Sequence, residues 1–165
     1  MNTPMTPPSS PAWPVVPGEQ QPPQEAWKLG HAGLIPFALG TLLVWLVGGD
    51  SDELRDAHVW VALSLSAYAG AIVAFLGGVH WGLAMRAGLP GGRAFRWAMV
   101  PPLVGWFGMI MPPHAGLVVL GVMLGVCYWK DRQLYTAAGL GYWLTLRFRL
   151  SAIAAFCCFL GAAGI

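Results

Sequence analysis

Apolar residues in this sequence fall into five long runs that are separated by short polar or charged connections. The runs cover residues 31–49, 57–85, 95–111, 114–130 and 146–164. A helix needs about 20 predominantly apolar residues to cross the hydrocarbon core of a bilayer, and each run is near that length or longer. The pattern therefore predicts an all-α membrane protein built as a bundle of five transmembrane helices.

The runs differ in length, and the difference affects how each one fits a bilayer. A helix over residues 95–111 or 114–130 reaches about 25 Å, against about 30 Å of hydrocarbon. Flanking Trp and Tyr side chains at the headgroups cover such a shortfall. The second run, 57–85, is longer than a bilayer requires. We expect it to tilt, to emerge from the bilayer or to break near its glycines.

The composition supports a membrane protein and excludes other classes. Of the 165 residues, 56% are hydrophobic and 10% are charged, whereas soluble domains carry roughly 25% charged residues. The net charge of +2 is small and lies in the connections, so nucleic-acid binding through a basic face is not expected. The lipid bilayer is the expected partner. Cys127, Cys157 and Cys158 lie in apolar runs, which favours buried thiols over a disulfide framework.

The first 28 residues differ from the rest of the chain, because they hold eight of the fourteen prolines and few charges. Such a segment cannot bury enough apolar area to offset its loss of chain entropy. We therefore expect a disordered, proline-rich tail over residues 1–28 and a membrane domain over residues 29–165. The tail lacks the basic start of a signal peptide. Cleavage of a signal anchor after the first run, near residues 47–51, is an alternative.

Lysines and arginines are distributed unequally between alternate connections. Eight of the nine lie on one side of the five-span arrangement, and the other side has only Arg55, within the acidic stretch DSDELRD. Positively charged connections tend to stay in the cytoplasm. The count predicts a cytoplasmic N-terminus and an outside C-terminus. The expected location is the cytoplasmic (inner) membrane of a bacterium, crossed several times.

Two proline pairs shape the third run. Pro101-Pro102 lies inside it, where the missing N–H groups and the ring clashes predict a kink or a restarted helix. Pro112-Pro113 ends it and leaves a connection so short that the third and fourth helices must be antiparallel neighbours.

Small residues recur at every fourth position of the second run. They are Ala62, Ser66, Gly70, Ala74, Gly78 and Gly82, with Gly77 beside the row. Residues at i and i+4 share nearly one helical face, so this row predicts a groove in which another helix packs closely. Gly121 and Gly125 form a shorter row in the fourth run. We expect the second helix to be central, although small residues are also simply common in a chain with 22 glycines.

His80 lies in the apolar stretch FLGGVHWGLAM, about 200° around the helix from the small-residue row. A buried imidazole needs hydrogen-bond partners, and the candidates are the hydroxyls of Thr145 and Ser151 or a backbone carbonyl freed at Gly77-Gly78. Structural hydrogen bonding and direct contact with a ligand both stay open for His80. The candidate functional residues are His80, Trp81, Tyr68 and Arg147.

Arg147 begins the fifth run as a cation at the membrane boundary. It is expected either to extend to lipid phosphates or to pair with Asp131, which is the one acidic residue of the two internal connections. Asp131 is placed outside the fourth run, so the apolar runs themselves are expected to hold no Asp or Glu.

Four stretches of the chain resemble a known family. They are LIPF at 34–37, YAGAIVAFLGGVHWG at 68–82, VPPLVGW at 100–106 and YWLTLRFRLS at 142–151. Together they resemble small integral membrane proteins grouped as domain of unknown function 3429, found in bacteria and including a vertebrate mitochondrial transmembrane protein. Pro102 and Ser151 depart mildly from the family pattern. The resemblance covers about residues 29–165 and implies a five-span fold without an assigned activity.

The residues favour a non-enzymatic bundle that binds or assembles another membrane component, such as a membrane protein. No metalloprotease motif, paired carboxylates, CxxC or phosphate-binding loop is present, and neither a cofactor nor a metal site is expected. One alternative is a small transporter or proton conduit in which His80, with Tyr68, Ser64 and Ser66, lines a polar path. A less favoured alternative is haem or metal binding by His31 with His80, or by His58 with His114.

Overall fold

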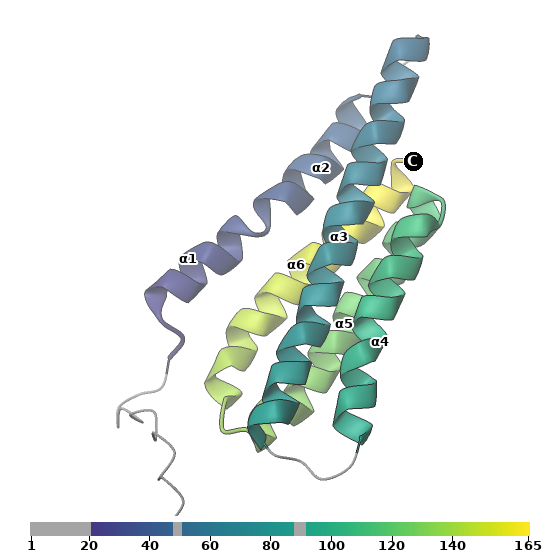
Figure 1. Cartoon of the computed structure of the whole chain (residues 1–165). Coiled ribbons are helices and arrows are strands. Elements are labelled where there is room, and N and C mark those ends of the chain that lie inside the picture. The colour runs from purple at the N-terminus through teal and green to yellow at the C-terminus, as the bar shows by residue number, and fades with distance from the viewer. Residues whose placement is uncertain (1–20, 48–50, 88–91) are drawn as a thin grey trace, which may run out of the picture.

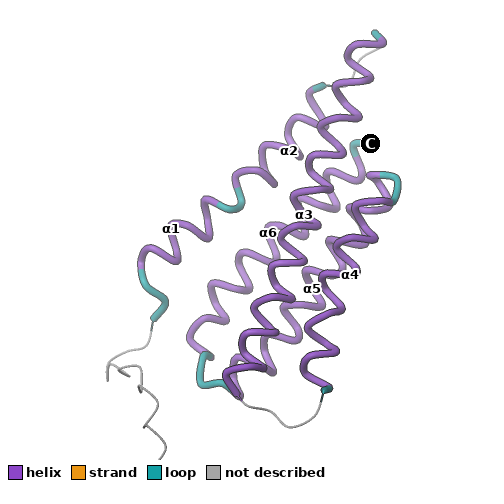
Figure 2. Tube along the Cα trace, in the orientation of Figure 1, coloured by secondary structure: helices purple, strands orange, loops and turns teal. Residues whose placement is uncertain are grey.

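The computed structural model describes residues 21–47, 51–87 and 92–165, and every regular element in these ranges is helical, with no strand (Figure 1; Figure 2). The helices are α1 Gln24–Ala32, α2 Ile35–Leu46, α3 Asp52–Ala87, α4 Arg93–Ile110, α5 Pro113–Ala137 and α6 Leu144–Ala163, and a 3₁₀ helix, η1, at Gly141–Trp143 leads into α6. The predicted all-α class is confirmed for the described part of the chain.

Four helical segments of the described residues are long and apolar enough to cross a membrane. They are Gln24–Leu46, which joins α1 and α2, then Asp52–Ala87, Pro113–Ala137 and Gly141–Ala163. α4 is not among them. It has 18 residues and carries Arg93 and Arg96 at its start.

Helices α3 to α6 alternate in direction along the bundle (Figure 1). α3 and α4 are antiparallel, since His80 meets Trp97 near one end and Gly70 faces Met109 nearer the other. α4 and α5 are joined by the predicted tight connection and pack as antiparallel neighbours. α3 contacts α2, α4, α5 and α6, which confirms it as the central helix.

α1 and α2 run parallel to α6. The Arg149 guanidinium lies over the Trp27 ring at 5.5 Å, and further along, the indole N–H of Trp45 donates to the Leu160 carbonyl over 3.0 Å. The start of α1 and the end of α6 therefore lie at opposite ends of the bundle (Figure 1).

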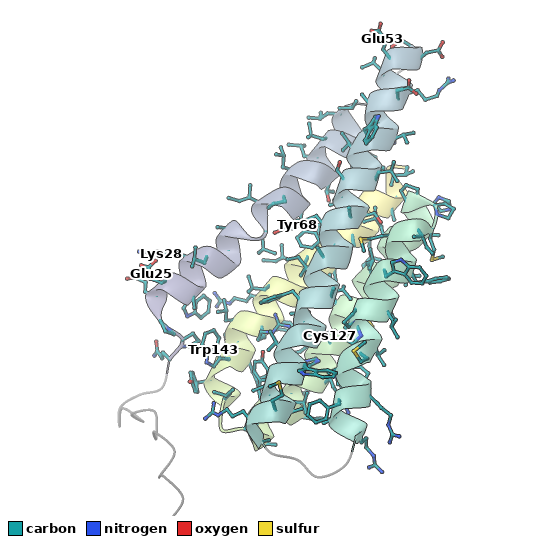
Figure 3. The ribbon with its side chains drawn as sticks, in the orientation of Figure 1. Glu25, Lys28, Glu53, Tyr68, Cys127 and Trp143 are labelled. Atoms are coloured by element: carbon teal, nitrogen blue, oxygen red, sulfur yellow. The ribbon has the colours of Figure 1, made fainter. Side chains whose placement is uncertain are left out.

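Several observed boundaries differ from the predicted ones. α1 begins at Gln24, inside the segment assigned to the tail, and residues 1–20 and 48–50 lie outside the described residues. α3 is unbroken through its glycines over 36 residues, about 54 Å of helix, and its Glu53 end projects past the other helices (Figure 3). α5 continues beyond residue 130 to Ala137, so Asp131 lies within a helix and not in a connection.

The first predicted run is interrupted between α1 and α2. Pro36 has no N–H for the helical hydrogen bond and its ring crowds the preceding turn, so the helix stops at Ala32 and restarts at Ile35. The hydroxyl of Tyr68 donates to the Gly33 carbonyl over 2.8 Å at this break and lies on the side of α3 that faces α1 and α2 (Figure 3). Phe37 packs edge-on against the Tyr68 ring. The contact between Phe37 and Tyr68 thus joins the LIPF stretch to α3.

α4 remains one continuous helix through Pro101 and Pro102, so the expectation of a restarted helix is wrong. Close packing against α3 explains why the prolines are tolerated. Pro101 is fully buried, and the ring of Pro102 lies against Gly77, which offers it no side chain to displace.

Only part of the predicted small-residue row packs against another helix. A Cβ on Gly70 would lie 2.5 Å from Met109 Cγ and 3.0 Å from the Gly105 carbonyl. Gly78 and Gly82 have no other described residue within 4 Å of such a position, so no described helix of this chain packs against them. Four residues turn a helix by about 400°, which is about 40° more than one full turn. The row therefore rotates away from its starting face with each step. Seven residues return to the same face, which is why Gly77 makes the contact instead.

A similar split occurs on α5. Gly121 packs against Phe159 and Cys158 of α6, whereas Gly125 is exposed and contacts no other helix among the described residues. The three cysteines are free and buried, as predicted, and Cys127 lies inside the bundle (Figure 3).

Gly77→Ala should destabilise the bundle, because the new methyl would meet the Pro102 ring and would lie 2.7 Å from the Ala98 carbonyl oxygen. Overpacking of this kind costs about 1–3 kcal/mol. Thermal unfolding of the purified protein in detergent measures the loss.

Gly78→Ala is the matched control, since nothing lies within 4 Å of its Cβ position. It should leave the melting temperature unchanged or raise it, because alanine orders a helix at about 0.5–1 kcal/mol less cost than glycine. Equal melting temperatures for the two variants would contradict the close contact at Gly77.

Candidate functional site

Four polar side chains, one from each of α3 to α6, meet inside the bundle. The indole N–H of Trp97 donates to His80 Nδ1 over 3.1 Å, and His80 Nε2 lies 2.6 Å from Asp131 Oδ1. The Nε–H of Arg147 donates to Asp131 Oδ2 over 2.8 Å. We call Trp97, His80, Asp131 and Arg147 the polar network.

Helical periodicity places the buried members of the network inward. On α5 the buried face runs through Leu120, Leu124 and Cys127 to Asp131 and Tyr135, at steps of three or four residues. On α3, His80 lies between Leu76 and Ala84 on another buried face. Asp131 therefore occupies a position where the pattern calls for an apolar residue.

The hydrogen bonds define the protonation of His80. An indole N–H can only donate, so Nδ1 of His80 accepts and carries no proton. Nε2 faces a carboxylate oxygen, so it carries the proton and donates it to Asp131. The imidazole is therefore neutral, and both of its nitrogens are occupied by protein partners.

Asp131 and Arg147 balance each other's charge away from water. The side chain of Asp131 is 0% exposed and that of Arg147 is 13% exposed. Nη2 of Arg147 also lies 2.7 Å from Oδ2, but its N–H bonds are not aligned for a hydrogen bond to any described residue. An unpaired charge in such a site would cost several kcal/mol, and Arg147 supplies the opposite charge next to the Asp131 carboxylate.

The sequence predictions for this site are partly corrected. Of the two alternatives for Arg147, pairing with Asp131 is the one observed. The expectation that the apolar helices hold no acidic residue is wrong, because α5 includes Asp131. Neither proposed hydroxyl partner of His80 is used: Thr145 is exposed, and the buried Ser151 hydroxyl has no partner among the described residues.

Trp97 and the contact between His80 and Asp131 are absent from the sequence predictions. Extending the apolar face of the fourth run by one more turn from Cys127 would have found Asp131. Nothing in the sequence singles out Trp97, since its role depends on how α4 packs against α3.

Two other predicted residues lie outside the network. Tyr68 bonds to the Gly33 carbonyl, and Trp81 is 40% exposed and packs edge-on against Phe95. His31, proposed as a haem partner of His80, has Nδ1 2.7 Å from the Trp27 carbonyl oxygen of its own helix. In the described ranges, no three His, Cys, Asp or Glu side chains gather as a metal site would require.

A cleft opens beside His80, where the end of α3, the start of α4 and the end of α5 come together. Its volume is about 610 Å³, within the 300–1,000 Å³ range typical of ligand pockets. It is lined by His80, Leu83, Ala84, Ala87, Gly92, Arg93, Ala94, Arg96, Trp97, Lys130, Leu134, Ala137 and Ala138. We call it the cationic cleft, because its charged lining residues are Arg93, Arg96 and Lys130.

Long apolar helices around a buried ion pair define a multi-pass helical membrane protein. The chain belongs to the family described as Protein of unknown function (DUF3429), whose model matches residues 22–163, which confirms the resemblance seen in the sequence. It is similar to Transmembrane protein 69 of Xenopus tropicalis, with 33% identity over 113 residues. That match covers 64% of this chain and 42% of the frog protein. No solved structure matches the chain.

Arg147→Leu should strongly destabilise the bundle, because it leaves the Asp131 carboxylate buried with a neutral histidine as its hydrogen-bond donor. Breaking a buried ion pair by removing one partner costs about 3–5 kcal/mol. Thermal unfolding in detergent measures the loss. Arg132→Leu removes an exposed arginine next to Asp131 in sequence and should change the melting temperature little.

The double variant Asp131→Asn with Arg147→Leu separates charge pairing from simple packing loss. The asparagine amide would still offer a carbonyl to His80 while the buried charge is gone, so the double variant should unfold at a higher temperature than Arg147→Leu alone. Additive losses in the double variant would show that the two charges are not coupled.

Proposed function

We propose that this protein crosses the bilayer five times and binds another membrane component in the cationic cleft, without catalysing a reaction. The five-pass count is supported by α4, which packs antiparallel along α3 as a full member of the bundle. It is also supported by the parallel directions of α1–α2 and α6, since an odd number of passes places them so.

The proposed orientation has the cationic cleft at the cytoplasmic face. The ends of α3 and α5 and the starts of α4 and α6 lie at this end of the bundle and carry Lys130 and every arginine of the chain except Arg55. Positively charged connections favour the cytoplasm. In a bacterium this bilayer would be the cytoplasmic membrane.

One observation carries the binding function: a sizeable cleft at the charged end of the bundle has a buried, fully paired histidine at its wall. His80 is 2% exposed, and its two nitrogens are engaged by Trp97 and Asp131. The polar network therefore fixes the position of the His80 ring in the cleft wall. Since the described lining has no hydroxyl, thiol or carboxylate, it supports binding better than acyl or phosphoryl transfer.

A proton conduit through His80 is the second candidate, because His80 both lines the cleft and bonds to Asp131. The rest of the described interior supports it poorly. The Thr41 and Ser66 hydroxyls donate to the carbonyls of Cys157 and Gly108, over 3.0 and 3.5 Å, so each is committed to helix packing. No run of polar side chains links them to the network among the described buried residues.

The orientation is tested by single cysteines labelled with a membrane-impermeant reagent in intact cells. A cysteine at Asp52 should be labelled from outside, and one at Arg93 only after the cells are opened. Labelling of the Asp52 position solely in opened cells would reverse the orientation. A further cysteine at the exposed His114, just after α4, should be labelled from outside, and its labelling from the same side as Arg93 would remove α4 from the count of passes.

The binding function is tested by purification from native membranes in mild detergent, followed by mass spectrometry of lipids and proteins. Ala137→Phe places a ring in the cleft at an exposed position, while Ala152→Phe adds the same ring to an exposed position of α6 outside the cleft. A component that accompanies the unaltered protein and Ala152→Phe should be lost from Ala137→Phe. The same set of components in all three preparations would contradict a ligand site in the cleft.

A further inference from the structure

The cationic cleft combines three positive charges with apolar walls. Arg93 and Arg96 come from the first turn of α4, and Lys130 comes from α5. Leu83 and Leu134, with several alanines, make the walls apolar. A cleft of this kind suits a ligand that has an anionic head and a hydrocarbon part.

We propose that the cleft binds the phosphate and the adjoining acyl region of an anionic phospholipid. This proposal rests on the proposed function, that the cleft holds a membrane component, and it names the chemistry of that component.

The three cations are available to an external anion. Among the described residues, carboxylates form ion pairs with Lys28, Arg55, His80 and Arg147. No described carboxylate forms an ion pair with Arg93, Arg96 or Lys130. The Lys130 ammonium lies 5.4 Å from the centre of the Trp97 ring and donates to Gln133 Oε1 over 3.1 Å. Both contacts leave its charge uncompensated and hold it at the cleft wall.

The polar network keeps the cleft cationic. Asp131 lies directly behind His80 and would repel an anion if its charge were unbalanced. Arg147 offsets that charge on the side of Asp131 away from His80, and His80, which lies between Asp131 and the cleft, is neutral. The field in the cleft is therefore set by Arg93, Arg96 and Lys130, and basic pockets between membrane helices on the cytoplasmic side are suited to anionic headgroups.

The aromatic side chains nearby indicate that the cleft lies at headgroup depth. Trp81 and Trp129 are 40% and 58% exposed on the same end of the bundle, and tryptophan is enriched where the bilayer meets water. A free inorganic phosphate would use the arginines but would leave the apolar walls empty. The combination favours the lipid.

The test uses the purified full chain in a neutral detergent, with its melting temperature followed as dioctanoyl phosphatidylglycerol is added. The matched probe is dioctanoyl phosphatidylcholine, which has the same tails and no net charge, and the third probe is inorganic phosphate. Phosphatidylglycerol at saturation should raise the melting temperature by about 5 °C, and the other two should have little effect.

Two double variants locate the effect. Arg93→Gln with Arg96→Gln should abolish the shift caused by phosphatidylglycerol. Arg132→Gln with Arg149→Gln removes the same charge from the same end but outside the cleft, and should retain the shift.

Each contrary result overturns the proposal. Equal shifts from both lipids would mean that the tails alone bind, and an equal shift from inorganic phosphate would assign the cleft to a free phosphate. Equal losses in the two double variants would reduce the effect to general attraction by a basic surface. If phosphatidylglycerol has no effect while Ala137→Phe still loses a copurified component, the lipid assignment fails and the binding function stands.

Discussion

The bundle depends on keeping one ionised carboxylate away from water. Asp131 is completely buried in α5, where a lone charge would cost several kcal/mol. Two partners make the position possible: Arg147 supplies the opposite charge, and His80 supplies a neutral N–H. Trp97 then fixes which nitrogen of His80 carries the proton. Because these residues come from four different helices, satisfying a single carboxylate also sets the arrangement of α3, α4, α5 and α6 around it.

Dispersion and shape complement this polar constraint elsewhere in the bundle. Apolar side chains gain little by leaving lipid for protein, so membrane helices rely on close packing. α3 and α4 obtain it at Gly70, Gly77 and Gly105, where the missing side chain lets a backbone carbonyl of the facing helix come close. Polar contacts and small-residue contacts therefore stabilise different parts of α3. The network holds the end with the cleft, and the glycine contacts hold the middle of the helix.

The sequence was sufficient for the class of fold, because length and hydropathy act over whole segments, and for the antiparallel pairing of α4 with α5, because their connection is short. It also named Asp131 as one of two alternative partners for Arg147, and the structure shows that pair. It failed where one turn of helix mattered. Ending the fourth run at residue 130 put Asp131 in a connection, and reading α3 strictly at every fourth residue put Gly78 in the row and Gly77 only beside it. The role of Trp97 needed the packing of two helices, which local patterns do not encode.

The Asp131–Arg147 pair has a consequence for biosynthesis. α5 presents its carboxylate to the bilayer before α6 has been made, and the neutralising guanidinium follows 16 residues later, beyond η1. A helix with an uncompensated charge partitions poorly into lipid. Insertion of α5 and α6 together, as a helical hairpin, would let Arg147 neutralise Asp131 before α5 enters the lipid.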